Sequence, residues 1–173
     1  MSLKTATTIY NDLFIAKELI YDPCGFNFSS LEKEVESTEY GAASFELNGV
    51  SITFRNAKIT PTKTGQFVTL WKRIEKGPIQ PFDFTDPIDL VIINTRKGER
   101  LGQFVFPKSV LCERGVITTS KKEGKRAIRV YPPWDQANNT QAQKTQKWQL
   151  DYFLEIPSDK PININRVKLL YGL

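Results

Sequence analysis

The chain has 173 residues, of which 40% are hydrophobic and 25% charged, and its formal net charge is +5. This length and composition exclude a disordered chain and predict one globular domain, residues 1–173, with a substantial core. The lack of histidine excludes imidazole-based triads and His-ligated zinc, and the lack of any apolar run near about 18 residues excludes a transmembrane helix.

The first third of the chain predicts a helix, a second and shorter helix, and a β-hairpin. Apolar residues at helical spacing predict an amphipathic helix over residues 8–21. A short helix is expected over residues 30–36, where acidic side chains would form a solvated face. Asn48-Gly49 supplies the two positive-φ positions of a type I′ turn, so residues 43–47 and 50–59 should pair as a hairpin.

The middle of the chain predicts the centre of a sheet. A strand over residues 65–73 precedes the most apolar run, residues 88–93, which we expect to be the central strand, buried on both faces. A turn over residues 96–99 leads into a strand over residues 101–106, and a short helix follows over residues 107–113.

The last third predicts a strand over residues 127–131 and a long helix over residues 138–153, while residues 162–171 fit either a strand or a helix. The sequence Gly-Gln-Phe-Val occurs at residues 65–68 and again at residues 102–105. Two occurrences do not make a repeat architecture, and pairing of the two strands in one sheet would explain them.

Positive charge is concentrated in the middle of the chain. Residues 54–130 carry 16 basic and 7 acidic side chains, whereas residues 1–53 carry 3 basic and 8 acidic ones. Residues 54–73 hold five basic side chains and no acid, interleaved with Phe67 and Trp71. This pattern indicates a surface for an anionic partner such as phosphate, with aromatic rings that can stack on bases. The alternative is that these charges spread evenly around the folded surface.

Two segments are candidate phosphate-binding elements. Residues 58–66 combine hydroxyls, lysines and a tight loop in the manner of a phosphate cradle, without the spacing of a Walker loop, and a basic β-turn is the alternative. Residues 124–134 form a second basic and aromatic run. The candidate nucleic-acid contacts are Arg55, Lys58, Thr60, Lys63, Gln66, Lys72, Arg73, Lys125, Arg126 and Arg129.

The helix expected over residues 138–153 has an unusual polar face. It carries glutamine at positions 141, 143, 146 and 149. Glutamine offers hydrogen-bond donors and acceptors without repelling phosphate, so this face is a further candidate for ligand contact. The simpler explanation is an ordinary helix surface made of good helix formers.

Several motifs together resemble the MepB family over roughly residues 13–153. They are EYGA from Glu39, FELNG from Phe45, RNAKITPTK from Arg55, GQF from Gly65, WKR from Trp71, GQFVFP from Gly102 and GKRAIRVYPPW from Gly124. The family is named for a small protein encoded beside a multidrug efflux pump and its repressor in staphylococci.

The resemblance implies an α/β (α+β) fold in which helices flank a mixed central β-sheet, similar to the restriction-endonuclease-like PD-(D/E)XK superfamily. Active members of that superfamily hold magnesium with acids on neighbouring strands and position water with a lysine. By this resemblance Glu46 and Lys58 are the catalytic candidates. The candidate metal ligands are Glu39 or Glu36, Glu46 and Asn56. Because a neutral amide holds a hard cation weakly, Asn56 in place of a carboxylate predicts a degenerate site.

We therefore expect a nucleic-acid-binding protein with sequence-tolerant phosphate contacts, no membrane partner and no required cofactor, whose partner is DNA rather than RNA. One alternative is a nuclease that uses Mg²⁺ or Mn²⁺ with Glu46 and Lys58. Another is an accessory protein of an efflux system, in which Trp71, Trp134 and Trp148 line a pocket for a cationic drug. The basic middle of the chain would repel such a cation.

The expected location is the cytoplasm. The N-terminus lacks the apolar run of a signal peptide. Cys24 and Cys112 do not make a disulfide framework, which indicates a reducing compartment.

Overall fold

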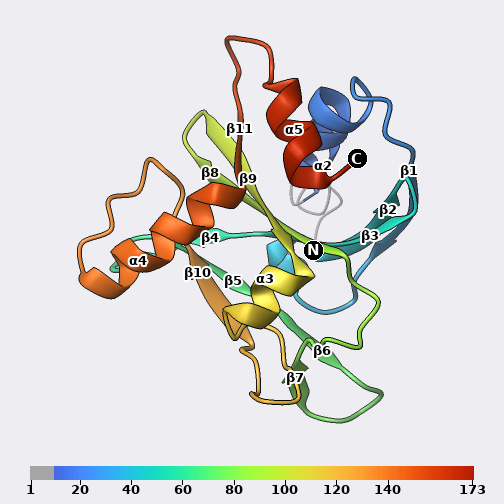
Figure 1. Cartoon of the computed structure of the whole chain (residues 1–173), viewed down its shortest axis with the longest axis vertical. Helices are drawn as coiled ribbons and strands as arrows, with labels where there is room; N and C mark the ends of the chain where they lie inside the picture. The colour runs from blue at the N-terminus through green and yellow to red at the C-terminus, as the bar shows by residue number, and fades with distance from the viewer. Residues whose placement is uncertain (1–9) are drawn as a thin grey trace.

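A six-stranded mixed sheet, in the order β1-β2-β3-β8-β9-β11, forms the centre of the computed structural model, which describes residues 10–173 (Figure 1). Its strands are β1 (Phe28–Lys33), β2 (Ala43–Leu47), β3 (Val50–Asn56), β8 (Leu90–Lys97), β9 (Arg100–Pro107) and β11 (Phe153–Ile156). Neighbouring strands are antiparallel, except that β3 and β8 are parallel. The prediction of a mixed central sheet flanked by helices is confirmed.

Each face of the sheet carries its own core. Helix α2 (Asn11–Ala16), the π-helical turn η1 (Lys17–Tyr21) and α5 (Ile164–Tyr171) cover one face, and Figure 1 shows α2 and α5 side by side. The short helix α3 (Lys108–Glu113), residues of α4 (Thr140–Gln149) and a second, smaller sheet cover the other face. Among residues 10–173, every helix is too short or too polar to pass through a bilayer.

Strand β8 confirms the prediction of a central strand that is buried on both sides. Leu90 and Ile92 point into the core beneath α2 and α5, whereas Val91 and Ile93 point into the core beneath α3. All four are at most 7% exposed. A near-continuous apolar run, rather than alternation, is what a strand with two covered faces requires.

The chain makes a long excursion between the parallel strands β3 and β8. It contains β4 (Lys58–Ile59), β5 (Gln66–Thr69), β6 (Trp71–Arg73) and β7 (Ile79–Pro81). Strands β4 and β5 join β10 (Ala127–Val130) in a three-stranded sheet of order β10-β5-β4, and β6 pairs with β7. Parallel strands need a crossover, and here β-structure supplies the crossover that a helix usually makes. The excursion carries the basic stretch out beside the main sheet.

The β2–β3 hairpin is confirmed, and its turn shows why. Asn48 and Gly49 have φ values of 50° and 79°, as a type I′ turn demands. The paired strand ends at Asn56 rather than at residue 59, because β4 leaves the main sheet for the smaller one.

Three sequence predictions are wrong in part or whole. Residues 30–36 do not form a helix, because Phe28–Lys33 pairs with β2 as the edge strand β1. The strand expected over residues 65–73 breaks at Leu70, where the chain passes from β5 to the β6–β7 pair. The two Gly-Gln-Phe-Val segments lie in different sheets, so they do not pair with each other.

The helices in the first and last parts of the chain lie close to their predicted positions. The helix predicted over residues 8–21 is observed from Asn11 to Tyr21, and its expected start at residue 8 lies outside the described residues. The helix predicted over residues 138–153 spans Thr140–Gln149, continues as the 3-10 turn η3 (Leu150–Tyr152) and gives way to β11 at Phe153. Residues 162–171, ambiguous in sequence, form α5.

Candidate nucleic-acid interface

A cleft of about 700 Å³ lies between the smaller sheet and α4. Strands β5 and β10 and the loop of residues 60–65 form one wall, and α4, over its whole length, forms the other. The lining comprises Thr62, Lys63, Thr64, Phe67, Arg114, Val116, Lys125, Ala127, Ile128, Arg129, Tyr131, Asn138, Asn139, Gln141, Ala142, Thr145, Trp148 and Gln149. The cleft therefore joins the predicted phosphate loop, the second basic run and the glutamine-bearing helix.

The cleft lining is cationic and carries no acid. Lys63, Arg114, Lys125 and Arg129 line it, without an aspartate or glutamate. Within residues 10–173 none of these four forms an ion pair with a carboxylate. Like charges gathered in a concave surface reinforce one another's potential and attract anions.

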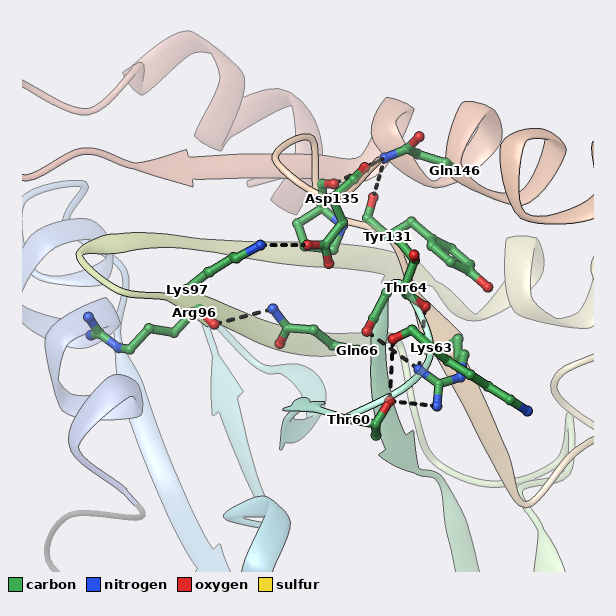
Figure 2. A network of polar contacts seen from close by, with 12 residues as sticks. Thr60, Lys63, Thr64, Gln66, Arg96, Lys97, Tyr131, Asp135 and Gln146 are labelled. Carbon is green, nitrogen blue, oxygen red and sulfur yellow. Dashed lines mark hydrogen bonds and ion pairs between the residues drawn. The ribbon is translucent and has the colours of Figure 1, made fainter. Parts of the chain in front are cut away.

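Arg129 holds the loop of residues 60–65 in shape. Its guanidinium donates to the Thr60 hydroxyl at 2.9 Å and to the carbonyls of Thr64 and Gly65 at 3.4 Å each (Figure 2). The Thr60 hydroxyl in turn donates to the Lys63 carbonyl at 3.4 Å. Thr60 and Arg129 were both predicted as phosphate contacts. In the structure their hydrogen bonds stabilise the loop that places Lys63 at the cleft.

Gln149 joins the two walls. Strand β10 is an edge strand, and the side-chain amide of Gln149 pairs with it as a neighbouring peptide group would. Its Oε1 accepts from the Tyr131 amide at 2.9 Å and its Nε2 donates to the Arg129 carbonyl at 3.0 Å. Gln146 adds donors to the carbonyls of Pro132 at 3.0 Å and Asp135 at 2.8 Å.

The ring of Tyr131 lies over Gly65. A Cβ at Gly65 would come within 2.6 Å of the Tyr131 ring, and the φ of Gly65 is +82°. The position therefore needs glycine both for its backbone and for the close ring. Figure 2 shows Tyr131 and Lys63 extending to the same side of the loop, away from Lys97.

Comparison with known proteins agrees with the family resemblance seen in the sequence motifs. Residues 34–155 match the family model described as MepB-like, which is well over half of the chain. The chain belongs to the MepB-like family. The crystal structure of MepB is similar over 87% of this chain and 99% of that chain, with 35% sequence identity and a TM-score of 0.74. Both walls of the cleft in this MepB-like chain fall inside the matched segment.

A second solved structure with a detectable likeness is the bacterial homing endonuclease I-Ssp6803I. It shares 14% sequence identity over 87% of this chain and 93% of that chain, with a TM-score of 0.46. A likeness at this level says nothing about the activity of the MepB-like chain. No curated protein matches the sequence.

Arg55 is buried in the MepB-like chain and is not a nucleic-acid contact, contrary to prediction. Its side chain is 0% exposed, and its two terminal nitrogens donate to the Glu34 carboxylate at 3.1 and 2.9 Å. A third bond reaches the Phe54 carbonyl at 2.8 Å. Burial lowers the pKa of Arg55, and the charge of Glu34 opposes that shift. The ion pair therefore links β3 to the residue that follows β1 and stabilises this part of the main sheet.

Four more of the predicted nucleic-acid contacts, the neutral Gln66 and three cations, are bonded to other residues of the protein. Gln66 is 1% exposed and donates to the Arg96 carbonyl at 3.2 Å, so it faces the interior rather than a ligand (Figure 2). Lys72 pairs with Asp86 at 2.8 Å. Arg73 pairs with Glu36 at 3.1 Å, and Arg126 with Glu123 at 3.1 Å. Of the ten predicted contacts, Lys63, Lys125 and Arg129 line the cleft.

The structure does not gather the predicted catalytic and metal residues. Glu46 faces Ser51 across the hairpin, whereas Asn56 lies five residues further along β3, about 17 Å away at strand spacing. Lys58 is on the smaller sheet, with its amine 4.8 Å from the centre of the Tyr40 ring. Glu39 is exposed on the 3-10 turn η2 (Thr38–Tyr40).

These residues do not fit a magnesium or manganese site. Hard cations need several oxygen ligands that converge on one point. Within residues 10–173, no three acidic or cysteine side chains come together in that way.

The three tryptophans do not form one pocket. Trp148 lines the cleft and packs on Phe106 with ring centres 5.4 Å apart. Trp134 packs edge-on against Phe153 at 5.7 Å, and Trp71 lies on β6.

Arg114 is the main site residue that sequence reasoning missed. It follows α3, outside both basic runs, and its guanidinium lies 5.0 Å from the centre of the Trp148 ring. A lone arginine after a short helix gives no local signal of its role. Its place in the cleft depends on the approach of its guanidinium to Trp148 of α4, 34 residues further along the chain.

Proposed function

We propose that this MepB-like protein binds nucleic acid through the cationic cleft, with phosphates on Lys63, Arg114 and Lys125. The observation that carries the proposal is a cleft lined by four cations and no acid. Charges that serve only solubility mix both signs and pair with one another on a folded surface. In the described part of this chain, the ion pairs between basic and acidic side chains lie outside the cleft, as with Lys72 and Asp86. The cations of the cleft therefore keep their positive charge uncompensated by these residues.

Such binding tolerates sequence, because phosphate contacts position a protein on nucleic acid without reading bases. Its affinity falls steeply with salt, since each neutralised phosphate releases condensed counterions. We propose DNA rather than RNA as the partner, and the two are compared in the same assay. The dispersed positions of Glu46, Asn56 and Lys58 favour a scaffold that binds without cutting, so no metal-dependent step is derived for it.

The test is a salt titration of oligonucleotide binding by two triple variants of equal charge. One variant replaces the cleft cations, as Lys63→Gln, Arg114→Gln and Lys125→Gln. The control replaces exposed lysines outside the cleft, as Lys76→Gln, Lys160→Gln and Lys168→Gln. The dependence of log affinity on log salt should flatten by roughly 2 to 3 in the cleft variant, at about 0.7 to 0.9 per lost phosphate contact.

The control should keep nearly the slope of the parent protein. Equal loss in the two variants would show that only net charge matters, and the cleft would then not be the binding site. A gel of the bound oligonucleotide, run with and without Mn²⁺, tests cutting in the same samples. Metal-dependent cleavage that Lys58→Ala abolishes would overturn the non-cutting proposal.

A further inference from the structure

The cleft is matched in size to a few unpaired nucleotides and not to a duplex. Its volume of about 700 Å³ lies within the usual range for small-ligand sites, about 300 to 1,000 Å³. The major groove alone of a B-form duplex is about 12 Å wide. A duplex is therefore too large to be enclosed by a cleft of this volume, although its phosphates can rest on the rim.

Aromatic rings line both walls of the cleft. Phe67 and Tyr131 come from the sheet wall, and Trp148 comes from the helix wall. Guanidinium groups lie over two of these rings, Arg129 at 5.9 Å from the centre of Phe67 and Arg114 at 5.0 Å from the centre of Trp148. Aromatic faces and guanidinium planes are the surfaces on which unstacked bases settle. In a duplex those base faces are already stacked and unavailable.

Neutral polar groups complete the lining between the cations. Gln141 and Thr145 on α4 face the cleft, as does Asn138 just before the helix. The side chains of these three residues and the Tyr131 hydroxyl have no hydrogen-bond partner within residues 10–173. Amides and hydroxyls offer donors and acceptors for the exposed edges of a base. A cleft meant for phosphate alone has no need of them.

We infer that the cleft takes unpaired nucleotides, so that single-stranded nucleic acid or an extruded base, rather than intact duplex, is the ligand. The inference rests on the proposed function and specifies the ligand of the same site. Bases enter between Tyr131 and Trp148, while the backbone follows Lys63 and Lys125. Gln149 fixes the separation of the walls before any ligand arrives.

The experiment compares three labelled probes with the full chain at a low and at a moderate salt concentration. They are a twelve-nucleotide thymidine strand, a duplex of equal length, and a strand of the same length with abasic sites in place of its central bases. Stacking contributes enough per base that loss of two or three bases should weaken binding about tenfold or more. The affinity for the thymidine strand should be at least about tenfold higher than the affinity for either of the other two probes.

A matched pair of variants separates the cleft from the rest of the helix. Thr145→Phe fills the cleft without changing charge, whereas Gln143→Phe places the same ring on α4 at a position that does not line it. Thr145→Phe should remove the preference for the single strand and leave the weaker binding of duplex to the rim. Gln143→Phe should leave both affinities within about twofold. Circular dichroism and urea unfolding of each variant show that the fold is retained.

The outcomes distinguish this inference from the proposed function. Equal binding of strand, duplex and abasic strand, all sensitive to salt, would overturn the inference while the proposed function stands. A preference for the single strand that survives in Thr145→Phe would also overturn it, because another surface would then make the distinction. No binding of any probe at low salt would overturn both.

Discussion

The buried Arg55–Glu34 pair gives the most direct test of the structure. Glu34→Gln keeps the size of the side chain and removes its charge, which leaves a guanidinium at 0% exposure without a counter-ion. Removal of one partner from a buried ion pair costs about 3 to 5 kcal/mol. The Glu34 side chain is 32% exposed, so water offsets part of that loss. We expect a loss of about 2 to 3 kcal/mol in the free energy of unfolding.

The measurement is urea unfolding followed by tryptophan fluorescence and circular dichroism. In a chain of this size, each kcal/mol lowers the melting temperature by about 2 to 4 °C, so the expected drop is about 4 to 12 °C. The control is Glu36→Gln, two residues along the chain, whose partner Arg73 is 34% exposed. Exposed pairs contribute little, so the control should lose less than about 1 kcal/mol.

A second variant checks the cause. Arg55→Met added to Glu34→Gln removes the uncompensated charge and should recover part of the lost stability. If Glu34→Gln loses no more than Glu36→Gln, or if the double variant is less stable than Glu34→Gln alone, Arg55 is not the buried cation that the structure describes.

Three further perturbations follow from the same contacts. Gln149→Ala leaves the Arg129 carbonyl and the Tyr131 amide without their partner and should cost about 2 to 4 kcal/mol in urea unfolding, whereas Gln141→Ala, at an exposed position, should cost under about 0.5 kcal/mol. Gly65→Ala strains a positive φ and displaces the ring over it, so melting should fall by several degrees and oligonucleotide affinity should drop with it. Burial raises the pKa of Tyr21 and of Tyr171 above the usual value near 10, so the unfolded state loses these protons first. Stability is therefore intact below about pH 10 and falls as the pH rises above it, with a shallower fall in Tyr171→Phe; a melting temperature that does not change between pH 9 and 11 would contradict this.

Elements defined by local sequence were predictable. The Asn48-Gly49 turn needs two positive φ values, which these residue types supply without help from the rest of the chain. The apolar run in β8 likewise reports burial on both faces. The edge strand β1 was missed because its pairing with β2 defines it as a strand, and hydrogen bonds across strands leave little trace in a six-residue segment.

The site was predictable only in outline. A basic patch is visible as charge density along the chain, and Lys63, Lys125 and Arg129 do line the cleft. Whether a given cation is free depends on partners far away in sequence, as with Arg55 and Glu34, which are 21 residues apart. The glutamines of α4 were noted as an unusual face. Two of them, Gln146 and Gln149, turned out to bind the backbone of β10 and the loop after it.

The bonds that hold α4 against β10 carry no formal charge. Gln149 and Gln146 reach backbone groups, and Trp148 packs on Phe106 behind them. Added electrolyte screens contacts between ions but hardly affects amide bonds and apolar packing. The width of the gap should thus stay constant over the whole range of a salt titration. A loss of affinity on adding salt then reports the screening of charges between the ligand and the cleft, and not a change in the shape of the cleft.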